Sequence, residues 1–265
     1  MPDYSRFEKV LAHQEGRLLT LTFNRPDNMN AIDGGVSGDL STLITLIRND
    51  DSVGAVLLRG EGRAFCAGGD IKMMSAATPT AVERVDSILG SKELLYSMLA
   101  IEQPIIAAVQ GFALGLGATI ALFCDIVLAA EDAYFADTHV NVGLVAGDGG
   151  AVLWPLLLPF GQAKYHLLTG DRITGADAAR MGMIHKAVPP DQLLDEATAV
   201  ARRLADGPTL ALKWTKKAVN QVLRERLDLI LEIGLALEGA TFLSDDFKEA
   251  SSAFIEKRKP TFTGR

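Results

Sequence analysis

One stretch of 22 residues, from 103 to 124, carries no charged side chain and constrains the fold more than any other part of the sequence. A helix of that length is long enough to cross a bilayer. The stretch contains Pro104, Gln110 and three glycines, however, and acidic residues flank it at Glu102 and Asp125. Proline and repeated glycine interrupt a single long helix. We therefore interpret the stretch as a buried strand, a glycine turn and a buried helix, and we expect no membrane partner.

Strand-like and helix-like patterns alternate along most of the chain. A helix is predicted where five apolar residues recur at helical spacing, namely Val36, Leu40, Leu43, Ile44 and Ile47. The other predicted elements are strands over 7–12, 17–23, 53–58, 105–109 and 125–129, and helices over 81–99 and from about residue 117. Alternation of this kind is typical of an α/β fold with right-handed crossover connections.

The chain changes character beyond about Asp191. Strand signals vanish there, and three helical stretches follow, separated near residues 207–208 and 244–245. Helices that expose apolar faces at a chain end often pack on another subunit. We therefore expect a core domain over residues 1–200 and a helical C-terminal subdomain over residues 201–265.

Charge and cysteine content exclude several classes of function. The net charge of −7 argues against a nucleic-acid partner, because phosphate binding needs clustered Lys and Arg. Cys66 and Cys124 are the two cysteines, and they form neither a disulfide framework nor a zinc-binding spacing. The N-terminus is charged from its third residue and lacks the apolar core of a signal peptide. We expect a cytoplasmic enzyme or binding protein without a metal.

Two glycine-rich loops, 67–70 and 111–118, each follow a predicted buried strand. Glycine lets a backbone approach a ligand closely, and a helix N-terminus offers unpaired N–H groups. Two such N–H groups that converge on one oxygen would form an oxyanion hole. The alternative is that the glycines only make tight turns in a crowded core.

Four segments of the sequence, 24–31, 63–72, 110–115 and 253–259, resemble the enoyl-CoA hydratase/isomerase (crotonase) superfamily. The resemblance implies a ClpP-like spiral of ββα units with a C-terminal helical trimerisation region, assembled as a homotrimer or hexamer. It also implies acyl-CoA thioester substrates, as in fatty acid metabolism. The shared chemistry would be stabilisation of an enolate, with no cofactor other than the coenzyme A of the substrate.

The resemblance also assigns binding residues by position. The oxyanion donors would be the backbone N–H groups of Gly69 and Leu116. Substrate would lie along the first glycine loop, at Ala67, Gly68, Asp70 and Ile71. Lys72 would lie near the CoA phosphates, and Phe254 and Lys257 would reach the CoA of a neighbouring subunit. Taken alone, Lys257 in its Glu-Lys-Arg-Lys run is typical of a solvated charged face.

The sequence departs from the hydratases of this family at their two catalytic glutamates. The matching positions are Thr119 and His139, and neither side chain is a carboxylate. The usual two-glutamate addition of water to an enoyl double bond is therefore not supported. The segment 137–150 is instead similar to the oxocamphor hydrolase branch, whose members cleave a carbon–carbon bond between two carbonyls. In that branch a histidine, an aspartate nine residues later and a C-terminal glutamate form the site, and they match His139, Asp148 and Glu238.

Each of these three residues also has a simpler interpretation. A lone histidine is more often structural, and Asp148 precedes an apolar run whose helix it could cap. Glu238 is harder to explain this way, because it continues an apolar stripe made by Leu227, Ile230, Leu231 and Gly234. A carboxylate on an apolar stripe needs a partner, at a site or at a subunit interface.

A mechanism follows if the three side chains converge. Asp148 would orient His139 and stabilise its imidazolium, and His139 would activate water as a general base. Glu238 would hold the water or relay a proton, and the oxyanion hole would hold the enolate.

Three functions remain open at this point. The first is an enoyl-CoA hydratase/isomerase-like enzyme, a lyase, that stabilises a thioester enolate. The second is a hydrolase that cleaves a carbon–carbon bond of a β-dicarbonyl substrate by retro-Claisen chemistry. The third is a non-catalytic CoA-binding protein that has lost both glutamates.

Overall fold

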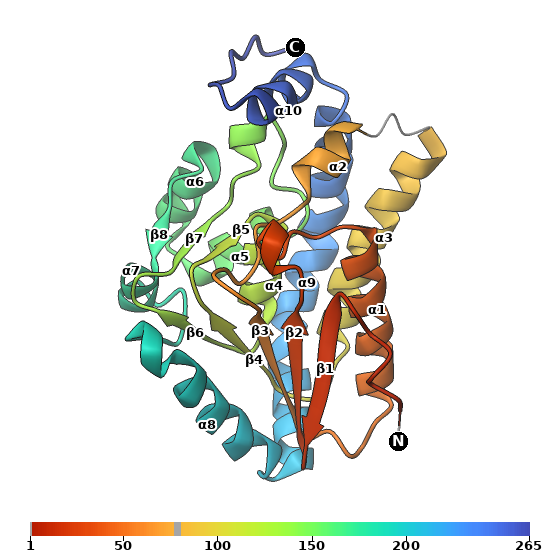
Figure 1. The fold of residues 1–265 in the computed structure, drawn as a ribbon, viewed down its shortest axis with the longest axis vertical. Helices are drawn as coiled ribbons and strands as arrows, with labels where there is room; N and C mark the ends of the chain where they lie inside the picture. Colours follow the sequence, from red (N-terminus) through yellow and green to blue (C-terminus); the bar gives the residue numbers. More distant parts are fainter. Residues whose placement is uncertain (1, 77–80) are drawn as a thin grey trace.

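The computed structural model describes residues 2–76 and 81–265, which form two sheets surrounded by helices (Figure 1). The strands are β1 Val10–Glu15, β2 Leu18–Phe23, β3 Ala55–Gly60, β4 Ile105–Val109, β5 Phe112–Leu114, β6 Ile126–Ala130, β7 Tyr134–Ala136, β8 Ile173–Thr174 and β9 Lys186–Val188. The helices are α1 Gly34–Arg48, α2 Ile71–Ala76, α3 Ala81–Leu99, α4 Leu116–Phe123, α5 Gly150–Leu157, α6 Phe160–Thr169, α7 Gly175–Arg180, α8 Leu193–Ala205, α9 Thr209–Thr241 and α10 Asp245–Glu256.

The larger sheet has six strands in the order β1-β2-β3-β4-β6-β9. β1 pairs antiparallel with β2, and every other pair in this sheet is parallel. Every residue of β4 is buried, as expected for a parallel strand covered on both faces. α8 contacts β3, β4 and β6 on one face, and α1 and α3 close the other. These covered strands hold the loops at their carboxyl ends in fixed positions.

A second sheet of three short strands, β5-β7-β8, extends from those carboxyl ends. β5 pairs parallel with β7, and β7 pairs antiparallel with β8. The segment that follows β7 carries residues 137–139 away from the sheet and into a short 3-10 helix at Val140–Val142. This second sheet therefore carries the first residue of the expected catalytic set.

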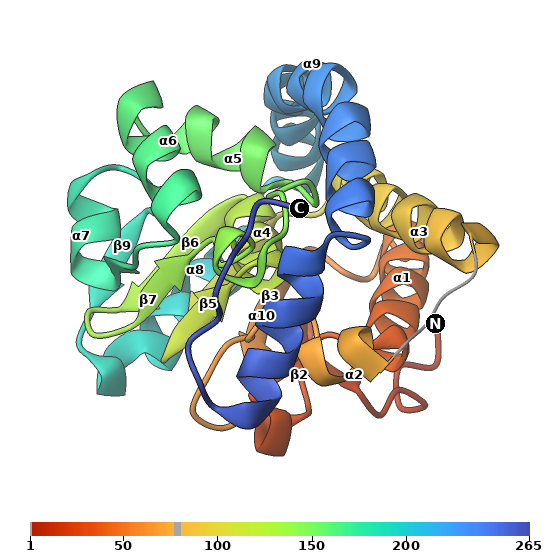
Figure 2. The same cartoon turned by 90° about the horizontal axis from the view of Figure 1, so that it is seen from above.

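The last two helices, α9 and α10, pack against other helices of the fold. The long helix α9 contacts both α3 and α5. α10 turns back after a Ser244 cap and packs beside α2, as Figure 2 shows. Across residues 2–76 and 81–265, no helix is long and apolar enough to span a membrane.

Most of the predicted elements are present with small shifts. The uncharged stretch forms β4, the turn with β5, and α4, which confirms the strand–turn–helix interpretation. The helix predicted over 81–99 and the three C-terminal helices are also present. The first strand begins at Val10, three residues later than expected. The second sheet and helices α5–α7 were not predicted, and the division at residue 200 stays a prediction.

Two glycines set the distance between α9 and the loop before α5. A β-carbon added at Gly147 would lie 2.3 Å from the Gly234 carbonyl oxygen and 2.8 Å from the β-carbon of Glu238. Only glycine allows this approach, because backbone and rigid helix atoms cannot move aside. The contact fixes Glu238 next to the loop that carries Asp148.

We predict that Gly147→Ala lowers the free energy of unfolding by about 1–3 kcal/mol, because the added methyl group forces the loop away from α9. Gly38→Ala is the matched control, since a β-carbon there meets nothing within 4 Å in the middle of α1. The control should gain about 0.5–1 kcal/mol from better helix propensity. Urea denaturation measures both changes. Equal stability of the two variants would contradict the close approach.

Candidate active site

A cavity of about 620 Å³ opens between the two glycine loops, the segment after β7 and α9. Its lining includes Gly69, Leu116, His139, Asp148 and Glu238, which are the five residues expected to carry the chemistry. Apolar side chains complete the wall, among them Met73, Met74, Leu94 and Leu235. A mainly apolar cavity with a few convergent polar groups is the usual form of a small-molecule site.

The two glycine loops pack directly against each other. The N–H of Leu114 donates to the Cys66 carbonyl at 3.0 Å, and the N–H of Cys66 donates to the Phe112 carbonyl at 3.1 Å. A β-carbon at Gly68, where φ is +84°, would lie 2.6 Å from the Leu114 carbonyl oxygen. The crowded-turn interpretation of these glycines is therefore correct for Gly68, and the packing brings the two loops together at the cavity.

Gly69 and Leu116 line this cavity from the two loops. Among the described residues, the hydrogen bonds of these loops engage the N–H groups of Asp70 and Gly115 and leave those of Gly69 and Leu116 without an internal acceptor. Leu116 is the first residue of α4, where N–H groups have no partner within the helix. The arrangement fits two donors available to a ligand oxygen.

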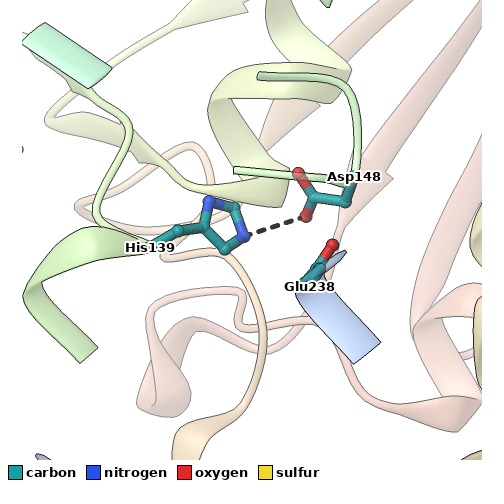
Figure 3. A group of neighbouring side chains, drawn as sticks. All are labelled: His139, Asp148 and Glu238. Atoms are coloured by element: carbon teal, nitrogen blue, oxygen red, sulfur yellow. Dashed lines mark ion pairs between the residues drawn. The ribbon is translucent and has the colours of Figure 1, made fainter. Parts of the chain in front are cut away.

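His139 lies between two carboxylates at the wall of the cavity. Its Nδ1 is 2.7 Å from Asp137 Oδ1, and its Nε2 is 3.2 Å from Asp148 Oδ2. The ring faces the second glycine loop, since a β-carbon on Gly115 would lie 3.5 Å from its Cε1. Figure 3 shows the ion pair with Asp148. Both nitrogens of the ring are therefore engaged.

The surroundings favour the protonated form of His139. Burial alone would lower the pKa of His139, but the carboxylates of Asp148 and Asp137 oppose this effect and raise the pKa well above 6.5. The two carboxylates therefore favour an imidazolium, which donates from both nitrogens. A protonated ring cannot itself accept a proton from water, and the general-base role expected from the sequence stays a prediction.

Glu238 reaches the same place from α9. The side chain is buried on the apolar stripe of the helix, next to Leu231 and Leu235. One ligand atom each of His139, Asp148 and Glu238 lie within 4.8 Å of one another. The carboxyl group of Glu238 points toward Asp148 in Figure 3. The predicted convergence of the three side chains is therefore present in the structure.

Asp148 does not act as a helix cap. Gly149 is the N-cap of α5, and no side chain makes a capping bond there. Asp148 instead faces His139 with one oxygen and lies 3.5 Å from the Thr119 hydroxyl with the other. Thr119 is thus a small polar neighbour of this carboxylate.

Asp137 was not predicted from the sequence, and the orienting role was expected of Asp148. The carboxylate of Asp137 meets Nδ1, on the far side of the ring from Asp148. The local signal was an Asp-x-His spacing directly after β7, at the point where the chain leaves the sheet. A carboxylate two residues before a buried histidine can return to the ring only if the backbone turns, and the sequence did not reveal that turn.

The predicted substrate-binding residues divide into two groups. Ala67, Gly68, Asp70 and Ile71 line the cavity. Lys72 is exposed on α2, while Phe254 and Lys257 are exposed on and after α10, and none of these three is part of the cavity lining. Their contact with coenzyme A stays a prediction.

The cluster is better suited to proton transfer than to holding a metal ion. His139, Asp148 and Glu238 are close enough for a cation to bridge them. Nε2 already faces Asp148, however, and the imidazolium that the carboxylates favour has no lone pair to offer. We therefore treat the three groups as an acid–base set.

Comparison with known proteins agrees with the resemblance seen in the sequence. The family model described as enoyl-CoA hydratase/isomerase matches residues 13–265. A short-chain-enoyl-CoA hydratase of Clostridium acetobutylicum is 36% identical over 251 residues, which cover 94% of this chain and 95% of the relative. A 1,2-epoxyphenylacetyl-CoA isomerase of Escherichia coli is 35% identical over 260 residues, covering 97% of this chain and 99% of the relative.

Solved structures agree with the fold. The crystal structure of an enoyl-CoA hydratase/isomerase from Mycobacterium paratuberculosis matches with a TM-score of 0.88 and 34% identity, and covers 92% of this chain and 97% of the other. The family model and these relatives span nearly the whole chain. The chain therefore belongs to the enoyl-CoA hydratase/isomerase family and has the crotonase fold.

Proposed function

We propose that the protein is an enzyme that acts on an acyl-CoA and stabilises its thioester enolate between the N–H groups of Gly69 and Leu116. The observation that carries the proposal is the convergence of His139, Asp148 and Glu238 on the cavity that these N–H groups line. Relatives named as enoyl-CoA hydratases and an acyl-CoA isomerase support the substrate class. A protein that only bound CoA would have no need of a buried charged cluster, since burying charge is costly.

The two kinds of acid–base group divide the proton transfers between them. His139, held protonated by Asp148 and Asp137, is the acid. Glu238, which reaches the same cluster from α9, is the base that takes a proton from water. This pair differs from two glutamates in the charge of its acid, because a protonated histidine is a cation and a protonated glutamate is neutral.

In an addition reaction, water would lose a proton to Glu238 and attack the β-carbon of an enoyl thioester. The electrons would move to the thioester oxygen, and the two N–H groups would hold the resulting enolate. His139 would then protonate the α-carbon. The product is a 3-hydroxyacyl thioester, and proton exchange with solvent restores both groups.

Hydrolytic carbon–carbon cleavage is the second candidate. Its support is the family resemblance, which places Thr119 and His139 at the positions of the two hydratase glutamates. Water activated by Glu238 would attack one carbonyl of a β-dicarbonyl, and the bond to the central carbon would break. The departing enolate would lie in the oxyanion hole and take a proton from His139, while the other fragment leaves as a carboxylate.

Assembly and location belong to the same proposal. The exposed apolar side chains of α9 support a homotrimer or hexamer, among them Trp214, Val222, Leu229, Ile233 and Leu237. We further propose a cytoplasmic protein that needs no cofactor beyond the coenzyme A of its substrate.

A panel of crotonyl-CoA, a β-ketoacyl-CoA and a cyclic β-diketone in isotopically labelled water distinguishes the reactions. Addition places the labelled oxygen in a hydroxyl group, and cleavage places it in a new carboxylate, as mass spectrometry can detect. His139→Gln and Glu238→Gln should each reduce turnover about 10²–10⁴-fold, because each removes a positioned proton-transfer group.

Glu232→Gln is the matched control on the same helix. Its carboxylate pairs with Lys92, and its side chain is 72% exposed. Turnover of this variant should equal that of the wild type. If the wild-type protein converts none of the three substrates, the enzymatic proposal is wrong and a non-catalytic CoA-binding function replaces it.

Calorimetric titration with acetyl-CoA and CoA tests the substrate class separately. Lys72→Ala and Lys257→Ala should each weaken binding about ten-fold, because each removes a cation placed near the phosphates by the family resemblance. Lys164→Ala, an exposed lysine on α6 beside Phe160, is the control and should bind normally. If neither ligand binds below millimolar concentration, the acyl-CoA proposal is wrong and a free dicarbonyl becomes the substrate.

A further inference from the structure

One carboxylate oxygen of Asp137 accepts two hydrogen bonds, and both come from His139. Oδ1 lies 2.7 Å from the ring Nδ1 and also accepts the backbone N–H of His139 at 3.3 Å. The side chain is almost fully buried, with 1% of the residue exposed. Two bonds from one residue to one acceptor fix both the ring and its backbone.

The second carboxylate oxygen of Asp137 has no hydrogen-bond donor among the described residues, so the buried charge of Asp137 must be compensated elsewhere. Among the described residues, no group donates a hydrogen bond to Oδ2, which is fully buried. It lies against Gly150, the first residue of α5, where a β-carbon would come within 2.0 Å of it. The start of a helix favours a nearby negative charge. The imidazolium and the helix start are thus the two features that compensate a buried anion here.

We propose that Asp137 is the positioning residue of this site, which holds the Nδ1–H of His139 so that Nε2 is the nitrogen that gains and loses the proton. The inference rests on the proposed function, because it assigns a role within that acid–base chemistry. Asp148 then belongs to the reacting face: its carboxylate lies against Nε2, in the cavity with Glu238. The two aspartates have opposite tasks although each meets one ring nitrogen.

The groups that face His139 come from three segments. Asp137 precedes it on its own segment, Asp148 stands before α5, and Glu238 projects from α9. All three are carboxyl groups, so each favours the cationic ring. Removing the charge of Asp137 alone should therefore make the ring lose its proton at lower pH.

Nuclear magnetic resonance of the unsubstituted protein tests the tautomer directly. Histidine labelled in the ring gives four sets of signals, and His139→Gln identifies the relevant set. As pH rises, Nδ1 should keep its proton and Nε2 should lose it. The proposal is wrong if Nδ1 is the nitrogen that becomes unprotonated. This measurement needs no substrate, so it stands even if the proposed activity fails.

Asp137→Asn tests the role in catalysis, because it keeps the shape of the side chain and removes its charge. We expect kcat to fall about 10–100-fold with KM nearly unchanged, less than the roughly 10⁴-fold loss seen when a catalytic triad loses its single orienting carboxylate. A step that needs the imidazolium slows as pH rises through the pKa of His139. That decline should therefore begin at lower pH in the variant.

Asp50→Asn is the control for loss of a buried carboxylate elsewhere. Asp50 is 6% exposed, accepts from Tyr4 at 3.0 Å and does not line the cavity. The Asp50→Asn variant should have the same His139 titration and the same pH dependence of kcat as the unsubstituted protein. If Asp137→Asn behaves as Asp50→Asn does in both, Asp137 has only a structural role. If Asp137→Asn does not fold, the tautomer of the wild-type ring still decides the proposal.

Discussion

The pairing of one buried histidine with buried carboxylates is the interaction on which the site depends. Asp137 and Asp148 hold the two nitrogens of His139, and Glu238 completes the cluster from α9. Charges of this kind are tolerated away from water only where an opposite charge or a hydrogen bond compensates them. Three separate segments must therefore meet with good geometry: the segment after β7, the loop before α5 and the C-terminal part of α9.

The rest of the fold supplies that geometry through close backbone contacts. Covered parallel strands fix the loops at their carboxyl ends, and glycines allow those loops to touch. Gly68 lies against Leu114 and brings the two glycine loops to one cavity, while Gly147 lies against Gly234 and brings α9 to the Asp148 loop. A side chain at either contact would push apart the segments that line the cavity. Gly68 and Gly147 thus contribute by allowing two segments to come close together.

The sequence predicted much of this because local patterns and family motifs were strong. The alternation of apolar segments indicated the α/β core, and the position of Glu238 on an apolar stripe indicated a buried, partnered carboxylate. The second sheet was missed because β5, β7 and β8 are only two or three residues long, too short for a periodic pattern. Asp137 was missed for a related reason. Its role depends on a backbone turn after β7 that brings it to Nδ1, and no spacing rule distinguishes that turn from an extended strand.

The central claim is that the N–H groups of Gly69 and Leu116 bind the thioester carbonyl oxygen. The cluster that includes His139 and Glu238 carries out the proton transfers. A crystal structure with an unreactive acyl-CoA analogue tests this most directly. We predict that the thioester oxygen lies about 2.7–3.1 Å from both N–H groups, with the acyl carbons facing His139 and Glu238. An analogue bound with its thioester oxygen away from both N–H groups, or with its acyl chain outside the cavity, would contradict the account.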